Sequence, residues 1–338
     1  MTNERIVFTA PGVAELQPAE WTHPQAGEVL VRMMYTTISS GTERANLSGC
    51  DTVGWQSGPS VHFPRYCGYS GAGVVMEVGE GVTEFKPGDR VATSWGTHCR
   101  YLIRDVQNVH PIEDDRLTFQ DAALALISTF PMAAVRKCRL EIGEPAIVMG
   151  LGVLGQLAVQ LLHTGGAVPV IAVDPVAERR AIALRFGADA ALDPTEPDFA
   201  ERVRTITHGG AKVAIEVTGI GKGLDNALDC MAPKGRVALL GCTRDSNFTI
   251  DYYRKVHGPG ITLIGAHTNA RPQSESSAGW WTTHDDIMAA QRLTAAGRLR
   301  LKEIVGEVHD PEEAPEIYRR LMTERTFPVV QFDWSKKD

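Results

Sequence analysis

A glycine-rich segment in the middle of the chain has the spacing of a dinucleotide-binding loop. It reads Gly150-Leu-Gly-Val-Leu-Gly155 and stands between an apolar run, residues 146–149, and an apolar segment of helical periodicity. In such a loop the first glycine permits a tight turn, the second lets the backbone approach a pyrophosphate, and the third lets helix and strand pack closely. Unpaired N–H groups at the helix start attract the anion. We therefore predict a pyrophosphate site at Gly150, Gly152, Val153, Leu154 and Gly155.

A carboxylate follows the next apolar run at the distance that such a loop requires. Asp174 comes directly after residues 170–173 and 22 residues after Gly152. At this place a carboxylate can accept both ribose hydroxyls of NAD, and it repels the additional phosphate of NADP. NAD is therefore the expected cofactor. Arg179 and Arg180 follow closely, as solvated charges or as partners of a phosphate, so use of NADP stays open as the less favoured alternative.

Two further turns follow later apolar strands. They read Val217-Thr-Gly219 and Leu240-Gly-Cys242. A doubly wound sheet binds its ligand at the carboxyl ends of its strands. We expect Val217, Thr218, Leu240 and Gly241 to border the dinucleotide.

The elements that must position these residues divide the chain into three parts. Residues 1–118 hold short apolar runs separated by turn signals, which predicts a β-rich domain. Residues 119–266 alternate between strand and helix patterns, which predicts an α/β domain with a doubly wound parallel sheet. The alternation stops in residues 267–338, where Thr283 is expected to cap a helix that ends at Gly297 and a second helix is expected over residues 314–323.

Composition excludes several classes of protein. The chain has 338 residues, with 34 Lys and Arg against 41 Asp and Glu, and no basic run that would neutralise a row of phosphates, so no nucleic-acid partner is expected. It has no apolar run long enough to span a membrane and its first residues are charged, so we expect a cytoplasmic protein. None of its six cysteines forms a Cys-x-x-Cys pair, and we expect free thiols.

Three segments of the β-rich part resemble the medium-chain dehydrogenase/reductase superfamily when taken with the glycine loop. They are residues 68–75, 78–82 and 85–91. The resemblance implies a GroES-like catalytic domain, a Rossmann domain and a C-terminal segment that returns to the catalytic domain. It also implies that Thr129, Leu240 and Ala266 border the nicotinamide, and that copies associate as a homodimer or homotetramer through residues 261–265.

The metal ligands of the superfamily's zinc-dependent members are replaced in this chain. The resemblance puts Ser40 at the cysteine position, before Gly41-Thr-Glu43, and Tyr69 and Ser70 at the positions of His and Glu. Neutral hydroxyls are poor zinc ligands beside thiolate, imidazole and carboxylate, so no metal is expected. In this respect the chain is similar to a zinc-less subgroup that includes the bacteriochlorophyllide hydroxyethyl dehydrogenases.

Without a metal, other groups must stabilise the negative charge that develops on the alcohol oxygen and accept the alcohol proton. The candidates are Thr42, which matches a proton-relay hydroxyl of the family, the phenol of Tyr69, the imidazole of His98 and the hydroxyl of Ser40. Each has a structural alternative: Thr42 as a turn cap, Tyr69 as filler of the metal space, and His98 as a buried structural histidine. Glu43 is expected to be mainly a structural partner of a cation.

The reaction that these features favour is NAD-dependent oxidation of a secondary alcohol. Trp55, Trp95 and Trp280 offer flat apolar faces that suit sugar rings, so the expected small-molecule substrate is a polyol, a sugar or a glycoside-like alcohol. Trp280 and Trp281 are alternatively anchors of the C-terminal segment. Two other functions stay open: a zinc-independent quinone or enal reductase that uses NAD(P)H, and a non-catalytic sensor of nicotinamide redox state.

Overall fold

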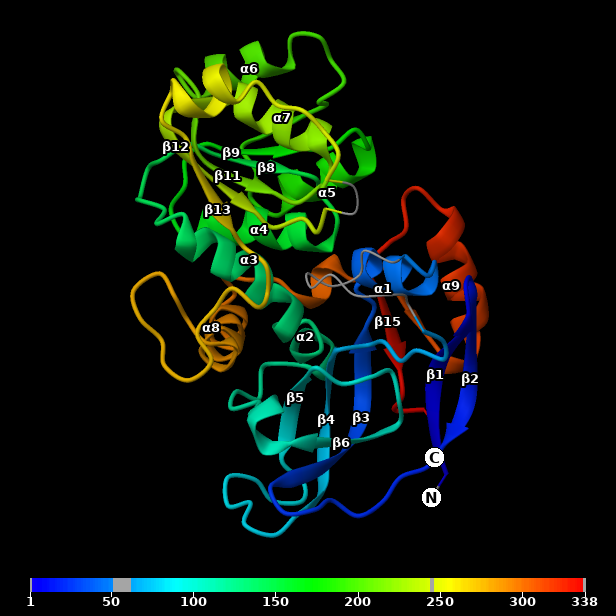
Figure 1. Cartoon of the computed structure of the whole chain (residues 1–338). Coiled ribbons are helices and arrows are strands. Elements are labelled where there is room, and N and C mark those ends of the chain that lie inside the picture. The colour runs from blue at the N-terminus through cyan, green and yellow to red at the C-terminus, as the bar shows by residue number, and fades with distance from the viewer. Residues whose placement is uncertain (1, 51–61, 244–245, 337–338) are drawn as a thin grey trace. The chain divides into compact units, whose positions relative to one another are not determined.

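The computed structural model describes residues 2–50, 62–243 and 246–336 (Figure 1). The chain forms two compact units. The first unit comprises Met1–Ile127, Ile287–Ala296 and Leu301–Asp338, and the second comprises Ser128–Asp286 and Gly297–Arg300. Residues 119–127 thus group with the first unit and residues 267–286 with the second, whereas the predicted boundaries follow residues 118 and 266.

The first unit is built on β-sheets. Strands β1 (Asn3–Ala10) and β2 (Val13–Ala19) form an antiparallel pair. A seven-stranded sheet has the order β14-β15-β3-β4-β5-β7, and β6 also pairs with β3. Its strands are β3 (Glu28–Thr37), β4 (Ser70–Val78), β5 (Arg90–Ser94), β6 (Tyr101–Asp105), β7 (Val109–Pro111), β14 (Glu307–His309) and β15 (Val330–Asp333).

One hydrophobic core holds the first unit together. Phe8 of β1 and Met33 of β3 pack in it with Phe332 of β15 and with Trp334, which is fully buried. Burial of side chains of this size contributes about 2 kcal/mol each to stability. Residues from the two ends of the chain therefore share one core.

The helices of the first unit are short. They are α1 (Ser40–Leu47), α2 (Phe119–Ala122) and α9 (Ala314–Thr323), with one-turn 3-10 helices at Val106–Asn108, Lys302–Ile304 and Pro311–Glu313. Thr118 and Asp121 form a capping box at the start of α2. The helix predicted over residues 314–323 is α9.

The second unit is a parallel sheet with helices on both faces, as predicted. Its strand order is β10-β9-β8-β11-β12-β13, and all of these pairings are parallel. The strands are β8 (Ala146–Met149), β9 (Val170–Val173), β10 (Ala190–Leu192), β11 (Ala211–Glu216), β12 (Met231–Leu239) and β13 (Thr262–Gly265). The order reverses between β8 and β11, which is where a doubly wound sheet binds its ligand.

Helices α6 and α7 lie on one face of this sheet, and α3 and α4 lie on the other (Figure 1). The helices are α3 (Ala125–Lys137), α4 (Val153–Thr164), α5 (Ala177–Arg185), α6 (Phe199–Ile206) and α7 (Gly221–Asp229), with a π-helical turn at Tyr253–His257. Helix α8 (Thr283–Ala295) begins in this unit, and its residues from Ile287 onward belong to the first unit. Apolar side chains of α6 and α7 pack on the central strands. Both α3 and α8 have residues in each unit.

The start of α8 differs from the prediction by one residue. The hydroxyl of Thr282, not that of Thr283, accepts the backbone N–H of Asp285 at 3.1 Å, and it donates to the Asp285 carboxylate at 2.9 Å. Thr283 is already the first helical residue, so its hydroxyl is one position too late to cap.

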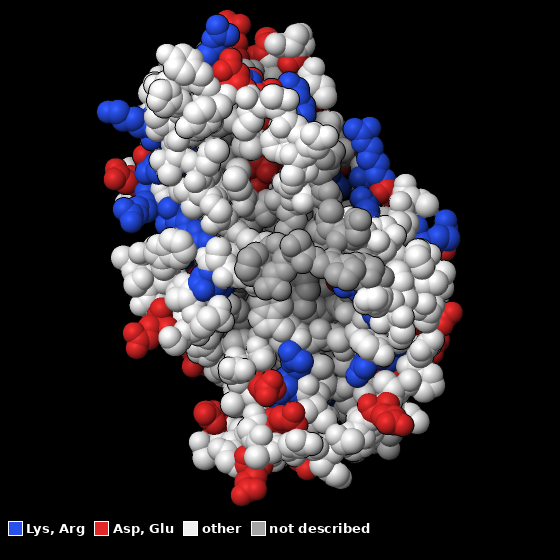
Figure 2. Space-filling view, viewed as in Figure 1, with Lys and Arg blue, Asp and Glu red and all other residues white. Residues whose placement is uncertain are grey.

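Acidic and basic side chains are interspersed over the face seen in Figure 2. None of the helices in the described ranges has the length and apolar character that crossing a bilayer requires.

Candidate active site

The three glycines of the loop after β8 have different surroundings. Gly150 has a φ of +94°, a conformation that side chains rarely adopt. A Cβ on Gly155 would lie 1.9 Å from the carbonyl oxygen of Gly150, so only glycine fits there. A Cβ on Gly152 would meet no described heavy atom within 4 Å. The first and third glycines therefore serve the turn and the packing, while the second leaves open space.

That open space lies at the start of α4. Gly152 is the N-cap residue of α4, and no described side chain caps this helix. The first N–H groups of the helix, from Val153 onward, are thus available to an anion. The buried apolar side chains of α4 hold this end of the helix against β8 and β9.

Asp174 lies beside the glycine loop. Its Oδ2 accepts the backbone N–H of Leu151 at 2.9 Å, and its Oδ1 accepts the N–H of Val176 at 2.8 Å. The guanidinium of Arg179 approaches Oδ2 at 3.6 Å, and Arg180 donates to the carbonyl oxygen of Asp174 at 2.7 Å. The loop thus carries a fixed carboxylate at the position where a ribose would bind.

The turns after β11 and β12 meet the glycine loop at the reversal point of the sheet. The N–H of Val217 donates to Met149 at 2.9 Å, and a Cβ on Gly150 would lie 3.0 Å from Cγ2 of Thr218. Leu240 and Gly241 both donate their N–H groups to the carbonyl oxygen of Glu216, each at 2.9 Å. The structure therefore brings the predicted residues Val217, Thr218, Leu240 and Gly241 together.

Glu216 is a residue of this site that the sequence analysis missed. It is buried at the end of β11, where it accepts the N–H of Thr218 at 2.8 Å and also the Thr218 hydroxyl. Burial raises the pKa of this carboxyl, although the hydrogen bonds from Thr218 act in the opposite direction. It shapes the turn that carries Val217 and Thr218.

A cluster of charges surrounds the two other residues predicted to border the nicotinamide. The carbonyl oxygen of Thr129 accepts a hydrogen bond from Arg271 at 3.1 Å, and Lys137 donates to the carbonyl oxygen of Gly265, next to Ala266, at 3.0 Å. The ammonium of Lys137 lies 4.8 Å from the ring centre of Trp280. Trp280 is therefore attached to α3 by a cation–π contact while its ring stays partly exposed.

The open space at Gly152, the uncapped start of α4 and the carboxylate of Asp174 together fit a nicotinamide dinucleotide. These are the groups that would hold its pyrophosphate and its ribose.

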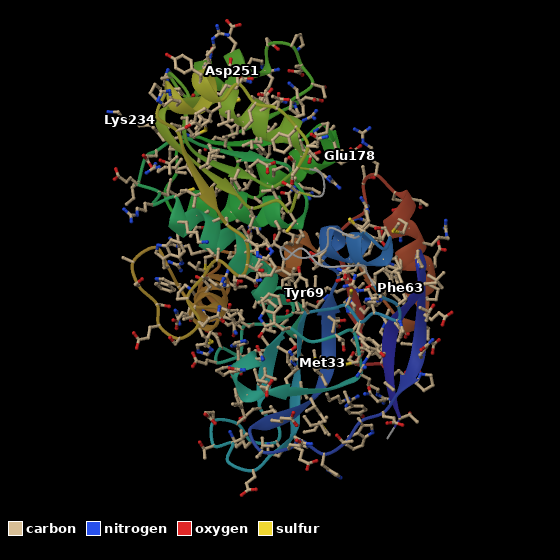
Figure 3. The ribbon with its side chains drawn as sticks, viewed as in Figure 1. Met33, Phe63, Tyr69, Glu178, Lys234 and Asp251 are labelled. Atoms are coloured by element: carbon tan, nitrogen blue, oxygen red, sulfur yellow. The ribbon has the colours of Figure 1, made fainter. Side chains whose placement is uncertain are left out.

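A hydroxyl pair forms the second site, in the first unit. The phenol of Tyr69, in the residue before β4, donates to Oγ of Ser39 at 2.5 Å (Figure 3 labels Tyr69). The ring of Trp95 lies beside it, with 5.7 Å between the centroids and an angle of 41°. Trp95 is 38% exposed and has a φ of +58°, so its backbone is held in an uncommon conformation beside this pair.

The sequence analysis selected Ser40 and Thr42, but the partner of Tyr69 is Ser39. Ser40 is the first residue of α1, and Thr42 lies in the same helix, where its carbonyl oxygen accepts the side chain of Asn46 at 2.8 Å. The hydroxyl that contacts Tyr69 therefore lies one residue before the position that the resemblance to the zinc-dependent pattern indicates.

A buried network lies directly behind Ser39. Glu43 accepts the N–H of Ser39 at 2.8 Å through Oε1, and the Tyr318 hydroxyl at 2.5 Å through Oε2. His98 connects Glu43 to Thr36, with its Nε2 3.1 Å from Oε2 of Glu43 and its Nδ1 2.7 Å from Oγ1 of Thr36. Burial, and then the charge of Glu43, raise the pKa of Tyr318, which keeps this phenol a donor.

The position of His98 bears on its predicted role in proton transfer. It is completely buried, and both of its ring nitrogens have partners inside the protein. These contacts favour the structural alternative, in which His98 holds Glu43, over direct exchange of a proton with a substrate.

Zinc does not fit the hydroxyl site. The positions that the resemblance assigns to zinc ligands hold Ser40, Tyr69 and Ser70, and the last of these donates its hydroxyl to the carbonyl oxygen of Ala123 at 2.7 Å. Within the described ranges, no group of three or more His, Cys, Asp and Glu side chains is arranged to hold a metal ion.

Of the predicted tryptophans, Trp95 belongs to the first unit and Trp280 to the second. Trp55 lies outside the described residues.

Comparison with known proteins agrees with this architecture. Residues 25–125 match the family of alcohol dehydrogenase GroES-like domains, and residues 153–280 match the family of zinc-binding dehydrogenases. Together the two matches cover most of the chain. The chain belongs to the medium-chain dehydrogenase/reductase superfamily, and it is an oxidoreductase that acts on CH–OH groups.

Individual relatives cover nearly the whole chain. It is 26% identical to D-guloside 3-dehydrogenase of Escherichia coli, over 94% of this chain and 96% of the relative. It is 28% identical to L-threonine 3-dehydrogenase of Pyrococcus horikoshii, over 93% and 94%. The crystal structure of galactitol-1-phosphate dehydrogenase from Escherichia coli superimposes with a TM-score of 0.82 at 20% identity, over 98% of this chain and 99% of that one, which supports the fold.

Proposed function

We propose that this protein oxidises a secondary alcohol to a ketone with NAD and without zinc. The observation that carries this proposal is the hydrogen-bonded pair of hydroxyls of Tyr69 and Ser39, of which Tyr69 stands at a position that the resemblance assigns to a metal ligand. A hydride transfer still needs a polar group at the reacting oxygen, and hydroxyls can hydrogen-bond an alcohol directly. We also propose that the chain belongs with the zinc-less subgroup that includes the bacteriochlorophyllide hydroxyethyl dehydrogenases.

The preference for NAD over NADP rests on Asp174. Its carboxylate is held by two backbone N–H groups, so it cannot swing away from a 2′-phosphate without losing both hydrogen bonds. The charge of the carboxylate then opposes that phosphate. NAD, when bound, supplies the acceptor for the hydride.

The proposed substrate is a polyol, a sugar or a glycoside-like alcohol. Trp95 presents a partly exposed indole next to Tyr69, and an indole face suits the apolar face of a sugar ring. A relative named D-guloside 3-dehydrogenase lends support to this class.

A substrate screen tests the proposal. Purified protein is offered secondary alcohols of this class with NAD and with NADP in parallel, and formation of the reduced cofactor is followed by absorbance. NADH formation with at least one polyol, sugar or glycoside is the expected result. Consumption of NAD(P)H with quinones or enals, without any alcohol oxidation, would instead support the reductase. Zinc that stays near one ion per chain after treatment with a chelator would contradict the zinc-free mechanism.

The choice of cofactor has its own test in Asp174→Asn. The amide keeps one oxygen for a backbone N–H but removes the charge, so we expect NAD to bind about tenfold more weakly, which is about 1.4 kcal/mol, and NADP to bind relatively better. Asp193→Asn is the matched control, because Asp193 pairs with Arg180 nearby. Titration of the two cofactors against intrinsic fluorescence measures both affinities, and an unchanged ratio of the two would refute the role of Asp174.

A further inference from the structure

A cavity of about 220 Å³ lies in the first unit, between one face of α8 and the segment that joins β7 to α2. The residues of α8 that line it follow the i, i+3, i+4, i+7 pattern of a single helix face. They are Met288, Gln291, Arg292 and Ala295. The residues that line it from the joining segment are Glu113, Asp114, Arg116 and Leu117. This cavity shares no residue with the candidate active site.

The buried amide of Gln291 is the unusual group of this cavity. Gln291 is 4% exposed, and neither its amide nitrogen nor its amide oxygen has a hydrogen-bond partner among the described residues. By contrast, the buried Gln331 in the same unit donates its amide nitrogen to Thr37 and to Gln120. Burying an amide without partners is costly, because the group loses its hydrogen bonds to water and gains none in return. Gln291 thus offers a donor and an acceptor, side by side, to a molecule that enters the cavity.

Two charged residues of the cavity also lack a counter-charge. Asp114 and Arg116 neutralise each other, with 2.6 Å between Oδ2 and Nη2. Glu113 and Arg292 are exposed, and neither forms an ion pair with another residue in the described part of the chain. The exposed part of the cavity therefore offers one carboxylate and one guanidinium, while its buried part offers the amide beside apolar side chains.

We propose that this cavity binds a free α-amino acid with a carboxamide side chain, glutamine or asparagine. A carboxamide carries its own donor and acceptor side by side, so it can form two hydrogen bonds with the amide of Gln291. The α-ammonium group then matches Glu113, and the α-carboxylate matches Arg292. The volume equals that of roughly seven molecules of liquid water, which suits a ligand of this size and excludes a dinucleotide.

Other ligand classes match fewer of these groups. A simple anion suits Arg292 but meets the carboxylates of Glu113 and Asp114, and a metal cation meets two guanidinium groups. A neutral sugar can pair with Gln291, but it leaves both unpaired charges unmatched. A zwitterion that carries an amide uses all three groups. The inference does not depend on the proposed alcohol oxidation.

Calorimetric titration of the full chain with glutamine and with asparagine tests the proposal. We expect saturable binding of at least one of them with one site per chain. Norvaline lacks the carboxamide and propionamide lacks the two charges, so each should bind at least tenfold more weakly. If neither amino acid binds at millimolar concentration, or if norvaline binds as tightly as glutamine, the proposal is wrong.

Gln291→Met removes the amide while keeping a side chain of similar volume. We expect it to bind the amino acid at least tenfold more weakly, and to melt at or above the temperature of the wild type, because this amide has no hydrogen bond to lose. Gln331→Met is the matched control: it should melt at a lower temperature but keep the wild-type affinity. Unchanged affinity in Gln291→Met would contradict the role of its amide.

The two exposed charges give a test that does not disturb the core. Glu113→Gln and Arg292→Gln should each weaken binding about tenfold. Asp115→Asn is the control, because Asp115 is an exposed carboxylate two residues from Glu113 that does not line the cavity. Tyr69→Phe should bind the amino acid as the wild type does, which separates this cavity from the candidate active site. If both charge variants keep the wild-type affinity, recognition of a zwitterion is refuted.

Discussion

Asp286 is a completely buried carboxylate, and two guanidinium groups approach it. Arg136 of α3 donates to Oδ1 at 2.9 Å, and Nη1 of Arg271 lies 3.7 Å from Oδ2. Burial raises the pKa of this carboxyl, and the two arginines oppose that shift. Because Arg271 also holds the carbonyl oxygen of Thr129, this one side chain ties α8 to α3.

Removing that carboxylate should destabilise the second unit strongly. Asp286→Ala leaves buried cationic groups without their counter-charge, and we expect a loss of about 3–5 kcal/mol in unfolding free energy. The neighbouring Asp285→Ala keeps the capping N–H but removes a carboxylate that accepts hydrogen bonds from the hydroxyls of Thr282 and Ser276, which should cost about 1 kcal/mol. Urea denaturation followed by circular dichroism compares the two variants, and equal losses would contradict the role of Asp286.

His309 makes the stability of the first unit depend on pH. Its two ring nitrogens contact Glu307 at 2.7 Å and Glu313 at 2.9 Å. Burial alone would lower the pKa of His309, but its hydrogen bonds to the two carboxylates outweigh burial and raise it above 6.5. Hydrogen bonds from Arg320, followed in size by the opposing effect of burial, hold the pKa of Glu307 at about 2.

The signs of these shifts define a window of pH. The contribution of His309 to the unfolding free energy is complete below its unfolded pKa of 6.5 and is lost as the pH rises through its higher folded pKa. The contribution of Glu307 is complete above its unfolded pKa of 4.5 and is lost as the pH falls toward its folded pKa of about 2. We therefore expect unfolding free energy to decline above pH 6.5 by up to about 1 kcal/mol. In His309→Gln this decline should shrink, and chemical denaturation at a series of pH values measures it.

Some residues of the site could be identified from the sequence and others could not. The glycine loop and Asp174 are close in sequence. The chemistry of a dinucleotide site requires glycines and a carboxylate at this spacing, so the spacing predicts that they lie together. Glu43 meets His98 across 55 positions and Tyr318 across 275, and no local pattern encodes such a meeting. Ser39 was missed because the resemblance directed attention to its neighbour Ser40.

At the scale of elements, substitutions at the start of α4 can distinguish an effect on folding from an effect on cofactor binding. Gly152→Ala adds a Cβ into open space at an ordinary φ of −69°, so the protein should fold normally. If the pyrophosphate binds there, NAD affinity should fall at least tenfold, about 1.4 kcal/mol.

Gly155→Ala is the contrasting variant in the same loop. Its Cβ would meet the backbone oxygen of Gly150, so we expect a loss of melting temperature as well as of NAD binding. Calorimetric unfolding and titration with NAD distinguish the two variants. A Gly152→Ala protein that binds NAD as the wild type does would show that the dinucleotide does not use this loop.

Elements that arise from a local sequence pattern could be predicted, whereas pairings between residues far apart in the chain could not. The bounds of β8, β9 and α9 coincide with the sequence patterns, because each is a compact apolar or amphipathic run. The place of β15 between β14 and β3 could not be predicted, because its pairing joins residues such as Gln331 and Thr37 across most of the chain.

At the scale of the whole molecule, we propose that copies of the chain associate along β13. This strand ends the described six-stranded sheet, and its side chains are mostly exposed, with Leu263 at 38%. An open apolar edge readily pairs with another chain. Leu263→Lys should shift a dimer or tetramer toward monomer in light scattering after size exclusion, and a wild type that is monomeric would contradict this proposal.

The arrangement of strands along the chain also determines the order in which the protein can form during synthesis. The six strands described in the second unit lie between residues 146 and 265, so they can pair while the ribosome is still translating the last part of the message. The sheet of the first unit cannot be completed until β15 and Trp334 have emerged, although β3 is made almost 300 residues earlier. At about 5–20 residues per second, residues 35–37 of β3 wait roughly 15–60 s for β15, while β6 can already pair with residues 28–32. A nascent chain interrupted in this interval exposes that short unpaired stretch to other chains.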